Sequence, residues 1–277
     1  YNPGQLLGYL STDNLPEDQR PALHFAVMSG GETLGDLVPY LQYAMASEIR
    51  MNVFEIQDYT FEINEEKMLT LAEEAAELGI ELLVMDDGWF KGRNTDTTSL
   101  GDWTEDKKKF PDGLQSLAEK VKQKGIDFGI WFEPEMISRE SDLYREHPDW
   151  VIRSPLYEPI LSRHQLVLDL SNPAVCEYLI EAVSKVLVPG NISYVKWDMN
   201  RHLTDLGSAY LDRKNQNELS HRYVLGLYQV METLTERFPQ VLFESCSSGG
   251  GRFDAGMLYY MPQTWTSDNT DAVCHLD

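Results

Sequence analysis

The sequence has few basic residues and no long apolar run. Its 277 residues include 23 Lys and Arg against 45 Asp and Glu, a formal net charge of −22. Such an acidic surface repels polyanions, so neither nucleic acid nor an anionic membrane face is expected as a partner. No segment reaches the roughly 18 apolar residues that a bilayer-spanning helix needs. Apolar residues at 42% and charged residues at 25% are typical of a globular protein with one large or two small domains.

Cysteine is also scarce. Cys176, Cys246 and Cys274 are odd in number and far apart, which predicts free thiols in a reducing compartment and a cytoplasmic protein. The six histidines show no metal-ligand spacing. The first residues, YNPGQLLGYL, contain neither Met nor the basic-then-apolar pattern of a signal peptide, and this predicts a fragment or a processed start.

Short apolar runs alternate with amphipathic stretches along the chain. Strands are predicted at MNVFEIQ, IELLVMDDGW, IDFGIWFEPEM, ISYVKWDMN and QVLFESC, and helices at about 64–78, 113–124, 173–187 and 217–238. This alternation predicts a parallel sheet buried on both sides. The run LVLDL before Ser171 predicts a short strand or an ordered loop. Residues 1–50, with an apolar run at 22–27 and a helix-like stretch at 34–48, form a separate segment that covers or completes the unit expected at 51–277.

Acids, aromatic residues and a lysine stand where the predicted strands end. These ends read Asp86-Asp87, Glu133-Pro-Glu135, Lys196-Trp-Asp198, Glu244-Ser-Cys246 and Ser267-Asp268. A doubly wound sheet concentrates function at one or two switch-point loops, whereas a closed (β/α)8 barrel collects it from every strand end. The sequence therefore predicts an α/β fold of the TIM-barrel type.

Paired carboxylates beside tryptophan are the groups that a glycosidase uses, one as nucleophile and one as proton donor. Asp198 follows a strand that carries Lys196, and a nearby cation favours an ionised carboxylate suited to attack. Asp268 stands behind Trp265 among apolar and acidic neighbours, which favour the protonated form that a general acid needs.

Each of these residues has a structural alternative. A single Asp at a strand end is often a helix cap or a turn residue, the role expected of Asp169 and Asp254. The tryptophans can be core residues, although their place beside strand-end acids favours a sugar pocket for Trp131 and Trp197. The run 249–251 lacks the Gly-Lys-Ser/Thr of a phosphate-binding loop, so a tight turn near a ligand is expected. Cys246 has no companion His, which argues against a cysteine nucleophile.

Six segments in order resemble the catalytic domain of glycoside hydrolase family 36, the α-galactosidases of the melibiose and raffinose type. They are LLVMDDGWF, DFGIWFEPEM, YVKWDMNR, HRYVLGLY, FESCSSGGGRFD and MLYYMPQTWTSDNTDA, and the resemblance extends over about residues 62–272. It implies a retaining α-galactosidase with a (β/α)8 catalytic barrel that acts on small α-galactosides of the melibiose or raffinose kind. No metal or organic cofactor is implied.

The resemblance also assigns roles to residues. Asp198 of KWDMN corresponds to the nucleophile, and Asp268 of SDNTD corresponds to the acid/base. The residues that it implies for binding the sugar are Asp86, Asp87, Trp131, Arg163, Lys196, Asn200 and Cys246. Gly249 is added to this set because the tight turn expected at 249–251 allows close backbone approach to a ligand.

Two features depart from the family pattern. Relatives carry Asn-Trp-Glu at the end of the first barrel strand, whereas this chain has Glu55-Ile56-Gln57, so a pocket tryptophan is missing. By the family's order Asp268 follows the sixth strand, which predicts a barrel that is incomplete at the C-terminus, with about six strands. A homo-oligomer is compatible with the family, whose contacts involve further domains. Two alternatives stay open: a catalytically silent barrel or galactoside-binding remnant, and a transglycosylase that passes galactosyl to another sugar.

Overall fold

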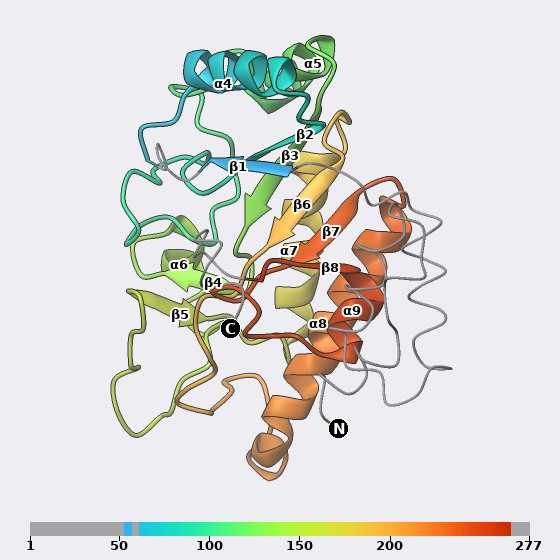
Figure 1. Ribbon diagram of the computed structural model, residues 1–277. Coiled ribbons are helices and arrows are strands. Elements are labelled where there is room, and N and C mark those ends of the chain that lie inside the picture. Colours follow the sequence, from blue (N-terminus) through green and yellow to red (C-terminus); the bar gives the residue numbers. More distant parts are fainter. Residues whose placement is uncertain (1–52, 57–60, 267–277) are drawn as a thin grey trace, which may run out of the picture.

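The computed structural model describes residues 53–56 and 61–266 (Figure 1). The predicted N-terminal segment 1–50 and the predicted acid/base Asp268 lie outside the described residues, as does Cys274. The main sheet has six strands: β1 (Val53–Ile56), β2 (Leu82–Met85), β3 (Asp127–Phe132), β6 (Tyr194–Trp197), β7 (Leu242–Ser245) and β8 (Gln263–Thr264).

All six strands are parallel, and their order in the sheet follows their order in the chain. A doubly wound sheet reverses direction at a switch point, whereas a barrel adds each new strand to the same edge. The observed order therefore confirms the predicted α/β parallel sheet wound in the manner of a barrel, and its six strands agree with the predicted incomplete barrel.

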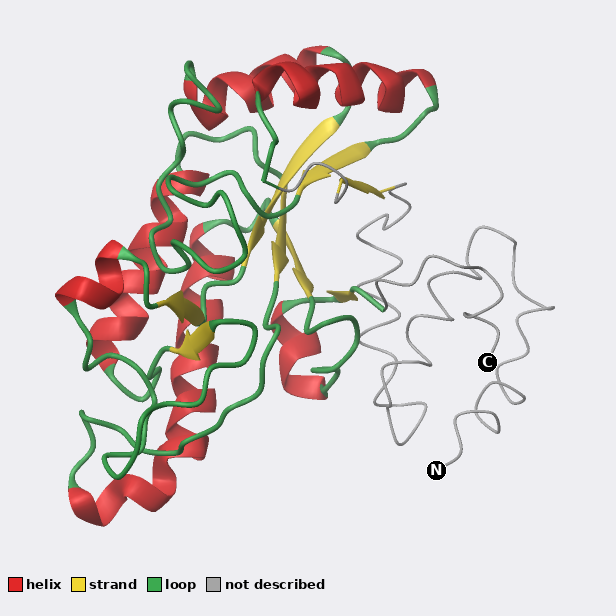
Figure 2. Ribbon diagram, turned by 90° about the vertical axis from the view of Figure 1, so that its left-hand side faces the viewer, coloured by secondary structure: helices red, strands yellow, loops and turns green. Residues whose placement is uncertain are grey.

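Four long helices confirm the sequence prediction: α4 (Glu65–Glu77), α5 (Gly113–Gln123), α7 (Pro173–Leu187) and α8 (Leu219–Arg237). Local signals fix where they begin. The side chain of Asn64 accepts a hydrogen bond from the Lys67 amide, and that of Asn172 accepts one from the Ala174 amide, with Pro173 in the first turn. Most helices lie on one side of the sheet when it is viewed edge-on (Figure 2).

Two short helices and a small two-stranded sheet complete the described chain. The helices are α6 (Asp142–Glu146) and α9 (Ala255–Tyr260), and a 3₁₀ helix, η3 (Arg213–Glu218), precedes α8. Asp254 caps α9 by accepting hydrogen bonds from the amides of Gly256 and Met257, as predicted. The run LVLDL begins within β5 (Gln165–Val167), which pairs antiparallel with β4 (Met136–Ser138) outside the main sheet. It is therefore a short strand and not a barrel strand.

The two faces of the sheet bury different sets of side chains. The face toward the helices carries the large apolar core, whereas the opposite face has a small cluster formed by Leu82, Val84 and Tyr194. Gly129 lies between them, and a Cβ at this position would come within 2.9 Å of the Tyr194 Cβ. Because side chains alternate along a strand, the residues two and four positions beyond this cluster also point to the inner face, at the carboxyl ends of the strands. The site is built there.

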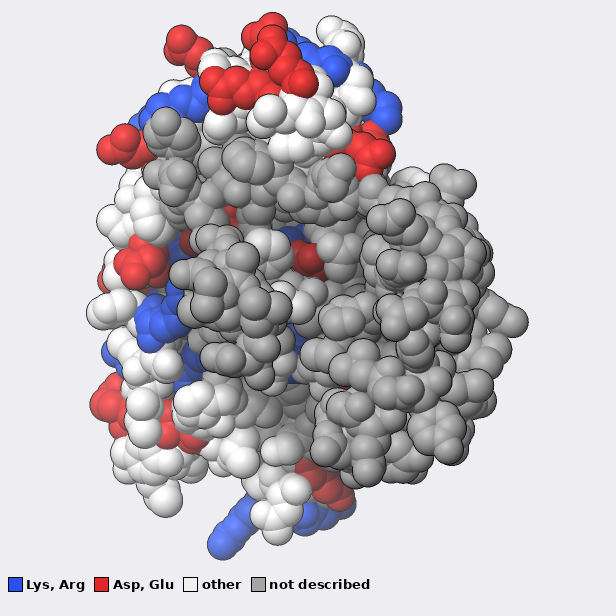
Figure 3. Space-filling view, viewed as in Figure 1, with Lys and Arg blue, Asp and Glu red and all other residues white. Residues whose placement is uncertain are grey.

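Acidic residues also lie on the surface, away from the carboxyl ends of the strands. Glu66, Glu73 and Glu74 are exposed on α4, and acidic side chains gather over this end of the molecule (Figure 3). Asp169, predicted to be a structural cap, is buried and accepts hydrogen bonds from the amide and hydroxyl of Ser171 in a turn, while the cap of the following helix is Asn172. Among the described helices, none is both long enough and apolar enough to cross a membrane.

Candidate active site

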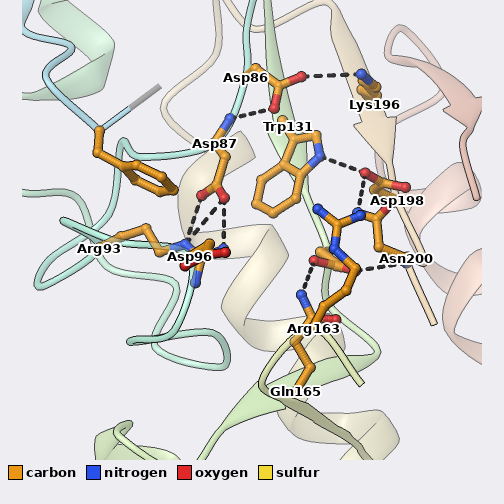
Figure 4. Close-up of a pocket in the computed structure, with 12 residues that line it drawn as sticks. Asp86, Asp87, Arg93, Asp96, Trp131, Arg163, Gln165, Lys196, Asp198 and Asn200 are labelled. Atoms are coloured by element: carbon orange, nitrogen blue, oxygen red, sulfur yellow. Dashed lines mark hydrogen bonds and ion pairs between the residues drawn. The ribbon is translucent and has the colours of Figure 1, made fainter. Parts of the chain in front are cut away.

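A pocket of about 260 Å³ opens at the carboxyl ends of the central strands. Seven of the sequence-predicted site residues line it: Asp86, Asp87, Trp131, Arg163, Lys196, Asp198 and Asn200. Five further residues complete the lining: Phe61, Arg93, Asp96, Glu133 and Gln165. Figure 4 shows that the acids converge from the ends of several strands on one space, so the barrel-type arrangement brings together residues that are up to 139 positions apart, from Phe61 to Asn200.

Asp198 is held in one orientation by three N–H donors. It follows β6, and its amide extends the sheet by donating to the Phe132 carbonyl at 2.7 Å. Its Oδ2 accepts from Trp131 Nε1 at 3.1 Å and from Asn200 Nδ2 at 2.6 Å, and its Oδ1 accepts from the Met199 amide at 2.9 Å. The side chain is therefore preorganised on the pocket wall.

Asp86 and Lys196 form an ion pair across β2 and β6. Lys196 Nζ lies 3.1 Å from Asp86 Oδ2, and both residues are buried, at 2% and 9% exposure. The ammonium group also lies 4.6 Å from the ring centroid of Trp265, within the range of a cation–π interaction. The ion pair shown for Lys196 is thus with Asp86, and its predicted effect on the charge of Asp198 stays a prediction.

Asp87 is paired with Arg93, a residue that sequence reasoning missed. Arg93 Nε donates to Oδ1 at 2.9 Å and Nη2 donates to Oδ2 at 2.7 Å, a two-pronged contact between buried groups. Burial raises the pKa of Asp87, while Arg93 acts in the opposite direction. Lys109 anchors the same loop by donating to the carbonyls of Gly88 at 2.7 Å and Arg93 at 3.0 Å. The available signal was a buried strand-end acid with a basic residue six positions later.

Glu133 was noted at a strand end but not assigned to the site. It is 1% exposed. Its Oε1 accepts from the Asn200 amide at 2.7 Å and its Oε2 accepts from Gln165 Nε2 at 2.9 Å. Burial, followed by the charge of Asp198, raises its pKa to about 8. The alternation of β3 could have identified it, because Trp131 and Glu133 are two residues apart and share a face.

Two other predicted residues lie beside the pocket and are not among the described residues that line it. Cys246, just beyond β7, is buried, and burial together with the charge of Asp198 raises the pKa of its thiol. Gly249 has φ +86° in the predicted tight turn. The neighbouring Ser248 hydroxyl donates to Asn200 Oδ1 at 2.9 Å. Sugar contacts of Cys246 and Gly249 stay predictions.

The prediction that Trp197 faces the sugar is wrong. Trp197 stands between Lys196 and Asp198, so strand alternation sends its ring to the opposite face. There it is fully buried, and its Nε1 donates to Glu135 Oε1 at 2.9 Å. Trp131 does reach the pocket, and its indole N–H is directed at Asp198.

No group of three or more His, Cys, Asp or Glu side chains within residues 53–56 and 61–266 is arranged to hold a metal ion. What the pocket offers instead is a preorganised carboxylate, two acid–base ion pairs and an indole ring. Ion pairs on a pocket wall present both hydrogen-bond acceptors and donors, the combination that sugar hydroxyls require.

Comparisons with known proteins agree with this geometry. A family model described as Melibiase matches residues 42–277. The α-galactosidase AgaA of Geobacillus stearothermophilus is 59% identical over 216 residues, which cover 78% of this chain and 30% of that protein. The crystal structure of that family 36 enzyme gives a TM-score of 0.80 at 56% identity, covering 83% of this chain and 33% of that one.

A second solved structure, the α-galactosidase of Lactobacillus brevis, also gives a TM-score of 0.80, at 46% identity, covering 91% of this chain and 34% of that one. Crystal structures of variants of the Geobacillus enzyme contain stachyose or raffinose. The chain spans about 30% of the length of the curated relatives that it matches.

Proposed function

The chain belongs to the melibiase family, the α-galactosidases of glycoside hydrolase family 36, and from this premise we propose that its pocket hydrolyses terminal α-galactosides with retention of configuration. The proposed substrates are galacto-oligosaccharides of the raffinose and stachyose type, the sugars present in the structures of the Geobacillus variants. The described residues match part of the catalytic barrel of the solved relatives.

The observation that supports this proposal most strongly is the setting of Asp198. Its carboxylate lines a pocket of about 260 Å³ and is oriented by Trp131 and Asn200. That volume is slightly below the roughly 300–1,000 Å³ of drug-sized ligand sites, in keeping with one sugar ring. A nucleophile fixed before the substrate arrives loses little conformational freedom in the transition state.

In the proposed first step, a carboxylate oxygen of Asp198 attacks the anomeric carbon of the galactosyl group. The bond from that carbon to the leaving oxygen breaks, and Asp268 donates its proton to the leaving oxygen. The products of this step are a free alcohol and a galactosyl ester on Asp198.

In the second step, the ionised Asp268 takes a proton from water, and the water oxygen attacks the same anomeric carbon. The ester bond breaks, the electron pair returns to Asp198, and galactose leaves. Two inversions at one carbon give net retention.

The ion pairs of the pocket are proposed to bind the sugar ring. Asp86 and Asp87 accept hydrogen bonds from galactose hydroxyls, while Lys196 and Arg93 hold these acids and donate to hydroxyl oxygens. The Trp131 ring lies on the wall of the pocket and provides an apolar surface for the C–H groups of the sugar. Each buried acid has a partner within the protein, so sugar binding exchanges one set of hydrogen bonds for another.

The experiment is cleavage of an aryl α-galactoside by the full chain, with the first anomer released identified by proton NMR. We expect α-galactose first, and we expect Asp198→Ala and Asp268→Ala each to nearly abolish cleavage. Asp149→Ala, at an exposed position outside the pocket, is the matched control and should behave like the parent. A parent-like rate for either catalytic variant, or β-galactose as the first product, contradicts the proposal.

The cleavage assay and a binding measurement together separate the alternatives. Galactose binding seen by calorimetry without cleavage would support a sugar-binding remnant, and a chain that neither binds galactose nor cleaves the substrate would be inert. Transfer of galactosyl to an added sugar in preference to water would identify a transglycosylase.

A further inference from the structure

We propose that Glu133 is a positioning residue for the reaction at Asp198, because it fixes the backbone of Asn200, whose side chain holds the nucleophile. This inference rests on the proposed function, since it assigns Glu133 a part in the step that Asp198 performs. Glu133 does not hydrogen-bond to Asp198 itself in any contact that the structure shows, so it positions Asp198 through Asn200.

Asn200 is fixed at three points. Its backbone N–H donates to Glu133 Oε1 at 2.7 Å, its side-chain oxygen accepts from the Ser248 hydroxyl at 2.9 Å, and its side-chain nitrogen donates to Asp198 Oδ2 at 2.6 Å. Asn200 lies three residues beyond the end of β6, where the sheet ladder has ended. Glu133 supplies the acceptor that a neighbouring strand would otherwise provide, and a buried N–H without an acceptor is costly.

Glu133 is in turn anchored to the two-stranded sheet formed by β4 and β5. Its Oε2 accepts from Gln165 Nε2 at 2.9 Å, and Gln165 is 2% exposed on β5. The Gln165 carbonyl also accepts from Arg201 Nη1 at 2.5 Å. Asn200 and Arg201, the second and third residues after Asp198, are therefore both held by hydrogen bonds, Asn200 to Glu133 and Arg201 to Gln165. The two-stranded sheet formed by β4 and β5, which lies outside the barrel sheet, thus sets the position of the segment that follows Asp198.

The charges around Glu133 make its electrostatic effect on Asp198 sensitive to pH, while its hydrogen bond with the Asn200 amide is kept. Three charged groups face it from different elements: Asp198 at the end of β6, Asp87 at the end of β2 and Arg163 before β5. Burial and the two anions raise its pKa, while Arg163 and the Asn200 hydrogen bond lower it. The neutral acid can still accept from the Asn200 amide. Its ionised form places a second negative charge beside Asp198 at alkaline pH.

Gln165 is suited to the neutral acid. Its Oε1 is buried and has no hydrogen-bond partner in the amide orientation that the structure shows. The two ends of a glutamine amide are interchangeable in shape, and a half-turn would bring Oε1 to the contact now made by Nε2. There the Gln165 oxygen can accept a hydrogen bond from the O–H group of a neutral Glu133. The contact between Glu133 and Gln165 can therefore form in either protonation state of Glu133, while Glu133 Oε1 still accepts the hydrogen bond from the Asn200 amide.

The test compares Glu133→Leu with Glu133→Gln in the full chain. Leucine removes the acceptor of the Asn200 amide, and we expect kcat on an aryl α-galactoside to fall about 10²-fold, the effect of misplacing a reacting group by about 1 Å, with KM little changed. Glutamine keeps an acceptor without a charge, so kcat near neutral pH should stay within about threefold of the parent, and the fall of kcat at alkaline pH should shift or disappear. Glu140→Gln, at an exposed site, is the control for loss of one negative charge.

Parent-like kcat in Glu133→Leu, or an unchanged alkaline limb in Glu133→Gln, overturns the inference. If Glu133→Leu does not fold, the pH profile of Glu133→Gln decides. If the parent cleaves no α-galactoside, the proposed function fails, and the inference is then judged by NMR. The side-chain amide signal of Asn200 should move in Glu133→Leu and stay near its parent position in Glu133→Gln, and an unmoved signal in Glu133→Leu contradicts the positioning role.

Discussion

A buried ion pair behind Asp198 gives the most quantitative prediction for stability. Glu135 is 0% exposed, and it accepts from Arg252 Nη1 at 2.7 Å on Oε1 and at 2.9 Å on Oε2. Trp197 Nε1 and the Tyr223 hydroxyl donate to the same carboxylate. Arg252 Nη1 also lies 3.0 Å from Met199 Sδ. Because Trp197 and Met199 flank Asp198, this network supports the chain on both sides of that residue.

Replacing Arg252 with Met leaves the Glu135 carboxylate buried without its cation. Removing one partner of a buried pair costs about 3–5 kcal/mol, and the full range applies because Glu135 is inaccessible and the Arg252 side chain is only 15% exposed. Glu135→Leu leaves the guanidinium uncompensated and also leaves the donors of Trp197 and Tyr223 without an acceptor, so its cost should be at least as large. Arg252 already has two buried nitrogens, Nε and Nη2, without hydrogen-bond partners, so the intact pair is not an optimal one.

The assay is urea unfolding of the parent, both single variants and the double variant. The losses of unfolding free energy in the two single variants should not add. The double variant should lose about as much unfolding free energy as one single variant, because neither buried charge is then left without its partner. Arg222→Met is the matched control, since its pair with Glu218 is exposed, at 43% and 51%, and should contribute less than about 1 kcal/mol. A loss below about 1 kcal/mol for Arg252→Met, or additivity of the two changes, would refute the reasoning.

Three further predictions concern the pocket. Trp131→Phe keeps an aromatic wall but removes the N–H donor of Asp198, so kcat on an aryl α-galactoside should fall about 10- to 100-fold, as expected for a hydrogen bond to a charged group; an unchanged kcat contradicts this. Arg93→Met leaves Asp87 buried without its cation, so calorimetry should show galactose affinity reduced about 10-fold or more, and parent-like affinity would argue against a binding role for this pair. The folded state raises the pKa of Glu133 from 4.5 to about 8 and so holds a proton that the unfolded chain releases. This contribution to stability is fully present below about pH 4.5 and is lost as the pH rises to about 8, so the unfolding free energy of the parent should decline relative to Glu133→Gln over that window. A difference in unfolding free energy between the parent and Glu133→Gln that does not change with pH would contradict this prediction.

Features of the fold that depend on local signals could be predicted from the sequence. Asn64, and Asn172 with Pro173, mark helix starts by side-chain capping and fixed backbone geometry, which are properties of a few neighbouring residues. Apolar runs that end in acids located the strands β2, β3 and β6, and parallel pairing then placed Asp86, Trp131 and Asp198 in one pocket.

Pairings between distant segments could not be predicted in the same way. The contact of Glu133 with Gln165 depends on the position of β5, and the pairing of β5 with β4 is set by tertiary structure. The ion pair of Lys196 joins it to Asp86, which is 110 positions away in the chain. Trp197 was misassigned because proximity in sequence was given more weight than the two-residue alternation of a strand, which separates it from Asp198.

The central claim is that Asp198 forms a covalent bond to the galactosyl group. The direct measurement is mass spectrometry of peptides from the full chain after reaction with an activated 2-deoxy-2-fluoro-galactosyl fluoride, which slows the second step and lets the ester accumulate. The account predicts one fluorogalactosyl adduct on the peptide that contains Asp198, and none in Asp198→Ala. An adduct on another pocket acid, such as Asp87 or Glu133, would contradict it.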